Sequence, residues 1–291
     1  MNLQGIMKRS FIVNIFLVVL KIISGLLFNS YALIADGIHS TSDLMSDIFV
    51  ILGIKHSLKP ADAEHPFGHG KFEYVLSFIL GISVILIAYN LAKNVILNFN
   101  DITEIPNITS LIIVIIVVVI KLFLAMYLIN KGKENDSQII SASGKESLTD
   151  VFSSIIVFFG VISVIIGEKY DFNILLKGDK IASIIIAIFI IRIGIIIVYD
   201  AVKSIQGKSV DNAICEIYKE EIKKIKGVID VDHINMIAYG PYYQALVEIR
   251  VDGNKTVTEG HDIAEKVTKK LYDTEKICNV LVHVNPEEGK E

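Results

Sequence analysis

Cysteine is scarce in this sequence. Only Cys215 and Cys278 occur among 291 residues, and both lie in the polar C-terminal part of the chain. Two cysteines do not imply a disulfide framework, and no Cys-x-x-Cys pair is present to bind a metal ion. The cysteine content therefore excludes a disulfide scaffold and a zinc site of the Cys-x-x-Cys type.

An excess of positive charge is also missing. The chain has 28 Lys and Arg against 32 Asp and Glu, which gives a formal net charge of −4. From Gly207 onward the charged residues are 12 basic and 16 acidic ones, and the rest of the chain is balanced. Nucleic-acid binders carry a basic patch or stripe. The charge balance therefore predicts no nucleic-acid partner.

Catalytic motifs are absent as well. The sequence has no His-Glu-x-x-His motif, and no Ser/His/Asp set stands out in it. A membrane metalloenzyme, such as an intramembrane hydrolase, needs a metal with an open coordination position together with a general base. We therefore keep a metalloenzyme only as an alternative and expect that the protein is not an enzyme.

Apolar residues, by contrast, are abundant. They form 52% of the chain, and the mean hydropathy is +0.55. Several runs reach the ~20 residues that a helix needs to cross a bilayer. The first run has no small-x-small cleavage site and is followed by further spans, so we interpret it as a retained helix and not as a signal peptide. The predicted spans are Met1–Phe28, Leu33–Leu58, Phe72–Leu97, Ile108–Ile129, Ile140–Gly167 and Lys180–Ile205. Within the first span, we expect Lys21 either to snorkel or to pair inside the bundle.

The loops between the spans differ in charge. Lysines gather in the second and fourth loops, whereas the segments 29–31 and 98–107 have no Lys or Arg. The lysines concerned are Lys55, Lys59, Lys71, Lys131 and Lys133. Because positively charged loops stay in the cytoplasm, this pattern predicts cytoplasmic N- and C-termini.

The pattern changes at Gly207. An amphipathic helix, two strands around the Gly240-Pro241 turn, a second helix and a third strand follow in about 80 residues. The predicted elements are Asp211–Ile225, Val231–Tyr239, Tyr243–Val251, Thr258–Tyr272 and Val280–Val284, with Thr258 and Glu259 suited to the start of the second helix. This αββαβ order predicts an α+β domain of ferredoxin-like type. We expect a transmembrane domain over 1–206 and a second domain over 207–291.

The second span carries four groups that are costly in lipid, Asp36, His39, Asp43 and Asp47. A carboxylate at the bilayer centre costs roughly 2.5–3.5 kcal/mol even on translocon insertion scales, so such residues are functional by default. His39 and Asp43 are four residues apart and share one helix face. This pair predicts half of a divalent-metal site, with Asp36 and Asp47 in supporting contacts or steering ions.

The fifth span repeats the same spacing with Glu146 and Asp150. If the two helices face each other, one imidazole nitrogen and three carboxylates converge. Such a set can close around Zn²⁺, and its oxygen-rich character also suits Fe²⁺, Co²⁺ or Mn²⁺. Alternatively, Glu146 is a solvated residue at the start of its span.

A further cluster lies between the second and third spans. Asp62, His65 and His69 supply metal-ligand types within eight residues. Pro66, Gly68 and Gly70 favour a turn that lets these side chains converge. We predict a loop metal site here, and a solvated loop is the alternative.

Two stretches, ALIADGIHSTSD and KPADAEHPFGHGKFE, together with the six spans and the α+β tail, resemble the cation diffusion facilitator family over nearly the whole chain. The resemblance implies a divalent-cation/proton antiporter in the cell membrane. It places the transport site at His39, Asp43, Glu146 and Asp150, and the loop site at Asp62, His65 and His69. Many zinc-transporting members carry a histidine in span five, where this chain has Glu146.

The same resemblance extends to Lys71 and the tail. Lys71 corresponds to a lysine that pairs with an aspartate after span six in similar proteins; here that position is Gly207, so Lys71 pairs with Asp200 or with nothing. The resemblance also implies a metal-binding or dimerisation role for the tail, where Asn285 replaces a common aspartate. The residues at its ligand positions are Asp232, His233, Glu248, His261 and His283.

Together these features predict a homodimeric exporter that exchanges one divalent cation for protons. Metal ligands must be deprotonated, so binding is coupled to proton release, and a histidine such as His39, with an unperturbed pKa of ~6.5, can titrate in the physiological range. The metal is the substrate, with Zn²⁺ as the first candidate and Fe²⁺, Co²⁺ or Cd²⁺ beside it, and no organic cofactor is expected. The alternatives are a Mn²⁺- or Fe²⁺-selective exporter, the metalloenzyme above, and a metal-binding scaffold that does not transport.

Overall fold

The computed structural model describes residues 3–57, 59, 61–101, 105–134, 138–274 and 276–287. The chain divides into two compact units. The first comprises Met1–Ile48 and Leu80–Ile197, and the second comprises Phe49–Ile79 and Val198–Glu291. Each unit is described below by itself.

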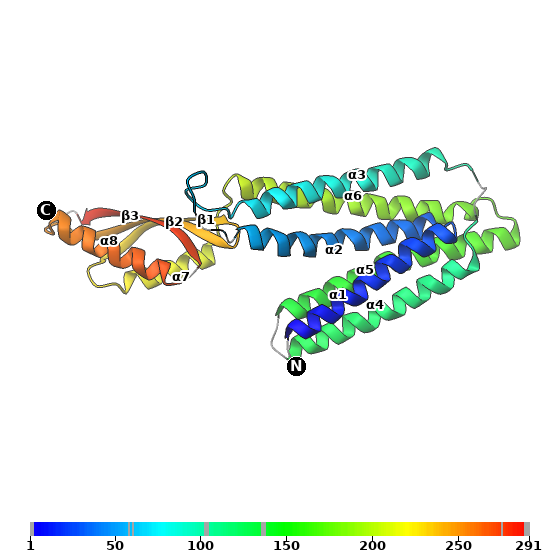
Figure 1. The fold of residues 1–291 in the computed structure, drawn as a ribbon, viewed down its shortest axis with the longest axis horizontal. Coiled ribbons are helices and arrows are strands. Elements are labelled where there is room, and N and C mark those ends of the chain that lie inside the picture. The colour runs from blue at the N-terminus through cyan, green and yellow to red at the C-terminus, as the bar shows by residue number, and fades with distance from the viewer. Residues whose placement is uncertain are drawn as a thin grey trace. The chain divides into compact units, whose positions relative to one another are not determined.

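The described part of the membrane domain contains six long helices (Figure 1). They are α1 (Leu3–Leu27), α2 (Tyr31–Ser57), α3 (Phe72–Leu97), α4 (Ile108–Glu134), α5 (Gln138–Tyr170) and α6 (Gly178–Ile205), with the short 3₁₀ helix η1 (Leu175–Lys177) before α6. Among the described residues, five of these helices are long and apolar enough to cross a membrane. The sixth is α2, which carries the polar groups of the candidate site.

Large apolar side chains cover the outer faces of the first unit, as a lipid-facing surface requires. Exposed examples are Phe16, Phe123, Phe159 and Ile188. The inner faces are closed by fully buried Leu17, Leu33, Val117 and Val157. The first unit is therefore apolar both inside and outside, and its few buried polar groups stand out.

Glycines allow two of the helix pairs to approach closely. At Gly37 of α2, an added Cβ would lie 2.7 Å from Cγ1 of Ile22 on α1. At Gly144 of α5, it would lie 2.8 Å from the backbone nitrogen of Ile129 on α4. Small residues permit such backbone approach in membranes. These contacts bring α1 against α2, and α4 against α5, around the polar groups described below.

A buried carboxylate from α6 fixes the start of α2. Asp179 accepts hydrogen bonds from the Ser30 hydroxyl at 2.6 Å and from the backbone N–H of Ala32 at 3.2 Å. The Ser30 hydroxyl in turn accepts from the backbone N–H of Leu33 at 3.1 Å. The first N–H groups of a helix lack intrahelical partners and favour negative charge. Asp179 therefore anchors α2 at the end before His39.

The C-terminal part of the second unit is a small α+β domain. Its elements are α7 (Asn212–Lys223), β1 (Asp230–Tyr239), β2 (Tyr242–Asp252), α8 (Val257–Tyr272) and β3 (Ile277–Glu287). The strand order is β1-β2-β3, with β1 antiparallel and β3 parallel to β2. The two helices pack on one face of the sheet (Figure 1). Ile222 of α7 and Val267 of α8 are fully buried there together with Val247 of β2.

The predicted fold class, a helical membrane domain followed by an αββαβ domain, is confirmed. The helix from Phe72 to Leu97 has the predicted bounds, and most of the other element ends differ by a few residues. Helix α8 begins earlier than the expected Thr258, because Thr256 is its N-cap and forms a capping box with Glu259. The domain limits of 1–206 and 207–291 stay a prediction.

Candidate metal centre

Three side chains in the first unit form a candidate metal centre. His39 and Asp43 of α2 and Asp150 of α5 each offer a ligand atom, and these atoms all lie within 4.8 Å of one another. His39 and Asp150 are buried, and Asp43 is partly buried. The distance from Nε2 of His39 to Oδ1 of Asp150 is 3.8 Å. The four-residue spacing places His39 and Asp43 on the helix face directed at α5.

Two polar atoms of this trio lack hydrogen-bond partners. Within the part of the chain that the structure describes, Nδ1 of His39 and Oδ2 of Asp43 are buried and unpaired. Buried polar atoms are satisfied in most native structures, and an unsatisfied one calls for an explanation such as an ion. Both atoms belong to side chains that can bind a divalent cation.

A narrow cavity opens beside the trio. It is lined by Asn14, Ser40, Asp43, Leu44, Lys121, Ser143, Glu146, Ser147 and Asp150, and its volume is about 30 Å³. A cavity needs about 10–15 Å³ of such volume to hold one water molecule, so this one has room for a water molecule or an ion. The size of the cavity is therefore compatible with a bound ion.

Glu146 lies on this cavity but outside the trio. The side chain is exposed, whereas Asp150, four residues further along α5, is buried. Of the two acidic residues on this helix, the structure places Asp150 next to His39 and Asp43 and leaves Glu146 nearer the solvent.

Asp150 is also paired with a buried lysine. Nζ of Lys121 on α4 lies 2.6 Å from Oδ2 of Asp150 and donates a second hydrogen bond, of 2.9 Å, to Oδ1 of Asn14 on α1. Lys121 is only 2% exposed. An ammonium group therefore occupies one side of the candidate metal centre.

A second lysine–aspartate pair lies deeper in the bundle. Nζ of Lys21 is 2.7 Å from Oδ2 of Asp36, and both residues are fully buried. Asp36 also accepts hydrogen bonds from the hydroxyls of Ser153 and Ser154, at 2.6 and 2.7 Å. The structure thus gives Asp36 a complete set of partners without an ion. The side chain of Asp47, the other predicted supporting residue, lies outside the described residues.

From the sequence alone, Lys121 had no predicted partner and the role of Lys21 was open. Periodicity shows that both lysines lie within apolar spans but not which helices face each other. The signal in the sequence was the position of each lysine inside an apolar span, because a charge buried at membrane depth is normally paired. Asn14, the second hydrogen-bond partner of Lys121, carried no such signal.

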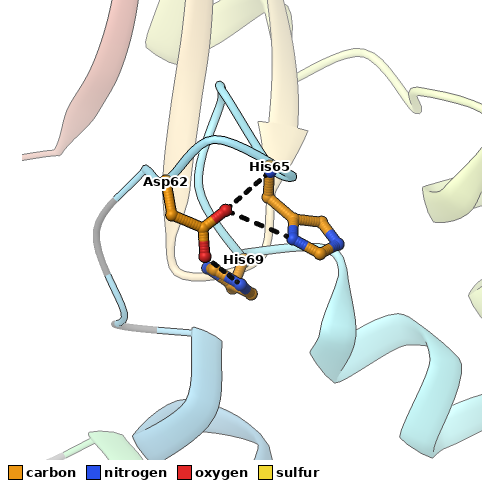
Figure 2. Close-up of side chains that lie close together, drawn as sticks. All are labelled: Asp62, His65 and His69. Atoms are coloured by element: carbon orange, nitrogen blue, oxygen red, sulfur yellow. Dashed lines mark hydrogen bonds and ion pairs between the residues drawn. The ribbon is translucent and has the colours of Figure 1, made fainter.

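The side chains of Asp62, His65 and His69, in the loop of the second unit, lie close together (Figure 2). Nδ1 of His65 lies 3.5 Å from Oδ1 of Asp62, and Nε2 of His69 lies 3.3 Å from Oδ2 of the same carboxylate. The ligand atoms of the three residues lie within 4.8 Å of one another. Asp62 and His65 are about half exposed, so this cluster is open to solvent, unlike the trio.

Backbone hydrogen bonds hold Asp62 in its place. The N–H of His65 donates to Oδ1 of Asp62 at 2.7 Å, and the N–H of Glu64 donates to the same oxygen at 3.0 Å. The hydrogen bond from His65 is the main cause that lowers the pKa of the Asp62 carboxyl below its usual value. A charged carboxylate is therefore available between the two imidazoles at neutral pH.

Lys71 joins the same loop to α6 through a backbone group. Its Nζ donates to the carbonyl oxygen of Ile205 at 3.0 Å, at the last residue of α6. A cation at a helix C-terminus satisfies a free carbonyl and complements the helix dipole. The prediction for Lys71 was a pair with Asp200 or no partner. In the structure its partner is instead the carbonyl oxygen of Ile205.

The register of the small sheet brings three of the predicted tail ligands side by side. His233 on β1 is opposite Glu248 on β2, which is opposite His283 on β3. Both histidines are exposed. Residues in directly opposite positions on neighbouring strands have interacting side chains. These three residues therefore form a row on the sheet face that the helices leave uncovered.

The other two predicted tail ligands are placed differently. Asp232 is bound by the guanidinium group of Arg250, and the side-chain amide of Asn285 donates to its Oδ2 at 3.2 Å. His261 lies on α8, where Nε2 is 3.4 Å from the carboxylate of Glu265. The five residues therefore do not converge on one point, and Arg250 already neutralises Asp232.

The fold and these sites define a class: a multi-pass helical membrane protein with metal-ligand side chains buried in its bundle and a C-terminal α+β domain. Residues 7–206 match the cation efflux transmembrane domain, and residues 210–287 match the cytoplasmic domain of cation efflux proteins. The chain belongs to the cation efflux family, which is the cation diffusion facilitator family indicated by its motifs. It is a metal-cation efflux transporter of the membrane and not an enzyme.

Three bacterial proteins illustrate what the chain is similar to. The chain is 34% identical to the manganese efflux system protein MneP of Bacillus subtilis over 94% of this chain and 93% of that one. It is 27% identical to the manganese efflux system protein MneS of the same organism, over 93% of this chain and 91% of that one. The magnetosome protein MamB of Magnetospirillum gryphiswaldense is 29% identical over 91% of this chain and 87% of that one.

Proposed function

We propose that the protein exports Mn²⁺ in exchange for protons, and that His39, Asp43 and Asp150 bind the ion within the membrane. The observation that carries this proposal is the buried trio, whose ligand atoms lie within 4.8 Å of one another beside an ion-sized cavity. Glu146, on the rim of this cavity, supplies a further carboxylate when the ion enters.

The donor atoms favour a hard cation. One imidazole nitrogen is combined with carboxylate oxygens, and carboxylate ligands suit Mn²⁺ better than thiolates or clusters of imidazoles do. The names of MneP and MneS, both called manganese efflux proteins, point in the same direction. Zn²⁺, the first candidate from the sequence, becomes the competitor against which Mn²⁺ is tested, together with Fe²⁺, Co²⁺ and Cd²⁺.

Proton exchange follows from the chemistry of the ligands. An imidazole or a carboxyl group binds a metal only after it has lost its proton, so metal binding and proton binding exclude each other at the trio. If the trio is alternately accessible from the two sides of the membrane, a cation leaves as protons enter. This proposal places the protein in the cell membrane with both termini in the cytoplasm, as the lysine-rich loops suggest.

Two further features are assigned to supporting roles. We assign a peripheral metal site to Asp62, His65 and His69, since their ligand atoms converge in a solvent-accessible loop. The C-terminal domain is proposed to form a homodimer, which its match to the cytoplasmic domain of cation efflux proteins supports. The row His233, Glu248 and His283 is the part of this domain best placed to bind metal.

The test is metal uptake into inverted membrane vesicles driven by a pH difference, with Mn²⁺, Zn²⁺, Fe²⁺, Co²⁺ and Cd²⁺ supplied in competition. We expect Mn²⁺ to be transported best and His39→Ala or Asp43→Ala to abolish its uptake. Asp262→Ala, which changes an exposed acidic residue on α8, is the matched control and keeps the wild-type rate. Undiminished uptake in both site variants would refute the site assignment, and preferential Zn²⁺ uptake would refute the choice of metal.

A further inference from the structure

Lys121 lies in the candidate metal centre but has no place in the metal-exchange scheme above. Its ammonium nitrogen is 2.6 Å from Oδ2 of Asp150, while Oδ1 of the same carboxylate is 3.8 Å from Nε2 of His39. The lysine and the imidazole therefore share one carboxylate. Lys121 also lines the cavity together with Asp43 and Glu146.

The position of this ammonium group conflicts with a bound divalent ion. Carboxylate oxygens bind a metal at ~2.0–2.2 Å, and the ammonium already lies at hydrogen-bonding distance from Asp150. Two cations on one buried carboxylate repel each other strongly, because the low dielectric of the bundle screens them poorly. The ion and the lysine must therefore compete for Asp150.

The structure also provides an acceptor for the displaced lysine. Oδ1 of Asn14 accepts a hydrogen bond of 2.9 Å from the same nitrogen and comes from α1, which contributes no residue to the trio. A long lysine side chain can swing about its stem while it keeps one such bond. Leaving Asp150 therefore does not leave the ammonium without a partner.

We propose that Lys121 is a tethered cation that occupies the metal centre when no ion is bound and competes with the transported ion for Asp150. It is a positioning residue that acts through Asp150. Its presence keeps the empty site electrically balanced, weakens metal binding and so speeds release of the ion. This inference rests on the proposed function, because it takes the trio as the ion-binding site.

Lys21 offers a matched comparison within the same bundle. It too forms a buried ion pair with an aspartate, at 2.7 Å. However, Asp36 also accepts hydrogen bonds from two serine hydroxyls, and it does not belong to the trio. A lysine that only balances buried charge should behave like Lys21, whereas a competitor should change the affinity for metal.

The test is equilibrium binding of Mn²⁺ to the purified full-length protein in detergent, followed by transport kinetics in proteoliposomes. For Lys121→Met and Lys121→Gln we expect at least an about tenfold lower Kd for Mn²⁺ than in the wild type. In transport, both variants should have a lower KM and a lower maximal rate, since release becomes slow. Lys121→Arg, which keeps the positive charge, should have a KM and a maximal rate close to those of the wild type.

Controls separate this inference from the proposed function. If Asp43→Asn binds Mn²⁺ as tightly as the wild type, the trio is not the site and the proposed function fails. If Asp43→Asn loses binding but the folded Lys121→Met and Lys121→Gln variants bind with an unchanged or higher Kd, only the tethered-cation proposal is overturned. Folding of each variant is checked by size-exclusion chromatography, and having two replacements guards against one that does not fold.

Discussion

Two lysine–aspartate pairs are buried in the same helical bundle, and they differ in how completely they are enclosed. The pair Lys21–Asp36 is fully buried, and serine hydroxyls satisfy the rest of the carboxylate. The pair Lys121–Asp150 borders a cavity and shares its carboxylate with His39. The same two residue types thus form a fully enclosed contact in one place and a contact at the edge of a cavity in the other.

Enclosure decides which of the two pairs is available to an ion. A metal that approached Asp36 would have to displace an ammonium and two hydroxyls in a region with no access to solvent. At Asp150 it would displace only the ammonium, and unpaired atoms of His39 and Asp43 would receive it. Buried charge alone therefore does not distinguish the two pairs. The unpaired ligand atoms beside Asp150 do, and they support the proposed site.

The strongest test of this difference replaces each pair by neutral residues. We expect Lys121→Met/Asp150→Asn to lose saturable Mn²⁺ binding, since one ligand is gone. Lys21→Met/Asp36→Leu should keep the Kd for Mn²⁺ within about threefold of the wild type, because a neutral pair of similar volume can replace a buried ion pair. Equal loss of binding in both double variants would show that the two pairs are not different in function.

Replacing Lys21 alone, in the fully buried pair with Asp36, should mainly lower the stability of the folded protein. Lys21→Met leaves Asp36 charged and uncompensated, which costs about 3–5 kcal/mol for a buried ion pair. Thermal unfolding of the detergent-solubilised protein measures this loss, and Lys21→Met/Asp36→Leu should recover most of it. If Lys21→Met were as stable as the wild type, the buried charge of Asp36 would not need Lys21 for its compensation.

Replacing Lys121 alone, in the pair that borders the cavity, should make the thermal stability of the protein depend more strongly on added metal. Ligand binding stabilises the folded state by about 2.7 kcal/mol at a concentration one hundred times the Kd. Because Lys121→Met is expected to bind more tightly, a fixed Mn²⁺ concentration should raise its Tm more than that of the wild type. The comparison variant, Lys21→Met, should gain no more than the wild type. A smaller gain in Lys121→Met would contradict competition for Asp150.

Several of these features could be predicted from the sequence, and others could not. The four-residue spacing gave the shared face of His39 and Asp43, and length and hydropathy gave the helices. The contact between Asp150 and Lys121 joins two helices whose relative rotation depends on packing at positions such as Gly144 and Ile129. No periodicity in one helix contains that information, so the partners of Lys121 and Lys21 needed the structure.

The tail shows the same limit on a smaller scale. The two helices and three strands were predicted, but not the start of α8, because Thr256 and Thr258 are both suitable caps by residue type. Geometry selects Thr256, whose backbone N–H and hydroxyl both donate to Glu259 at 2.8 and 2.9 Å. Likewise, the family resemblance placed Asp232 at a ligand position, whereas in the structure Asp232 lies at a β-bulge and pairs with Arg250.

The smallest expected effect concerns this cap, which belongs to the second unit and serves as a reference for the two pairs in the first unit. Thr256→Ala should destabilise α8 by about 1 kcal/mol, as the loss of an N-cap does. Hydrogen exchange at the α8 amides measures it, and Mn²⁺ binding should not change. The hydrogen bond from the Thr256 N–H lowers the pKa of Glu259. The carboxylate's contribution is therefore present above the unfolded pKa and lost as pH falls through the lower, folded one.

Exchange of Mn²⁺ and protons at the buried trio can be tested by recording both fluxes in the same proteoliposomes. With a Mn²⁺ gradient as the only driving force, the wild type should move protons against the direction of Mn²⁺, and Asp43→Asn should move neither. Mn²⁺ flux without any change in luminal pH, or flux through Asp43→Asn at the wild-type rate, would contradict the account.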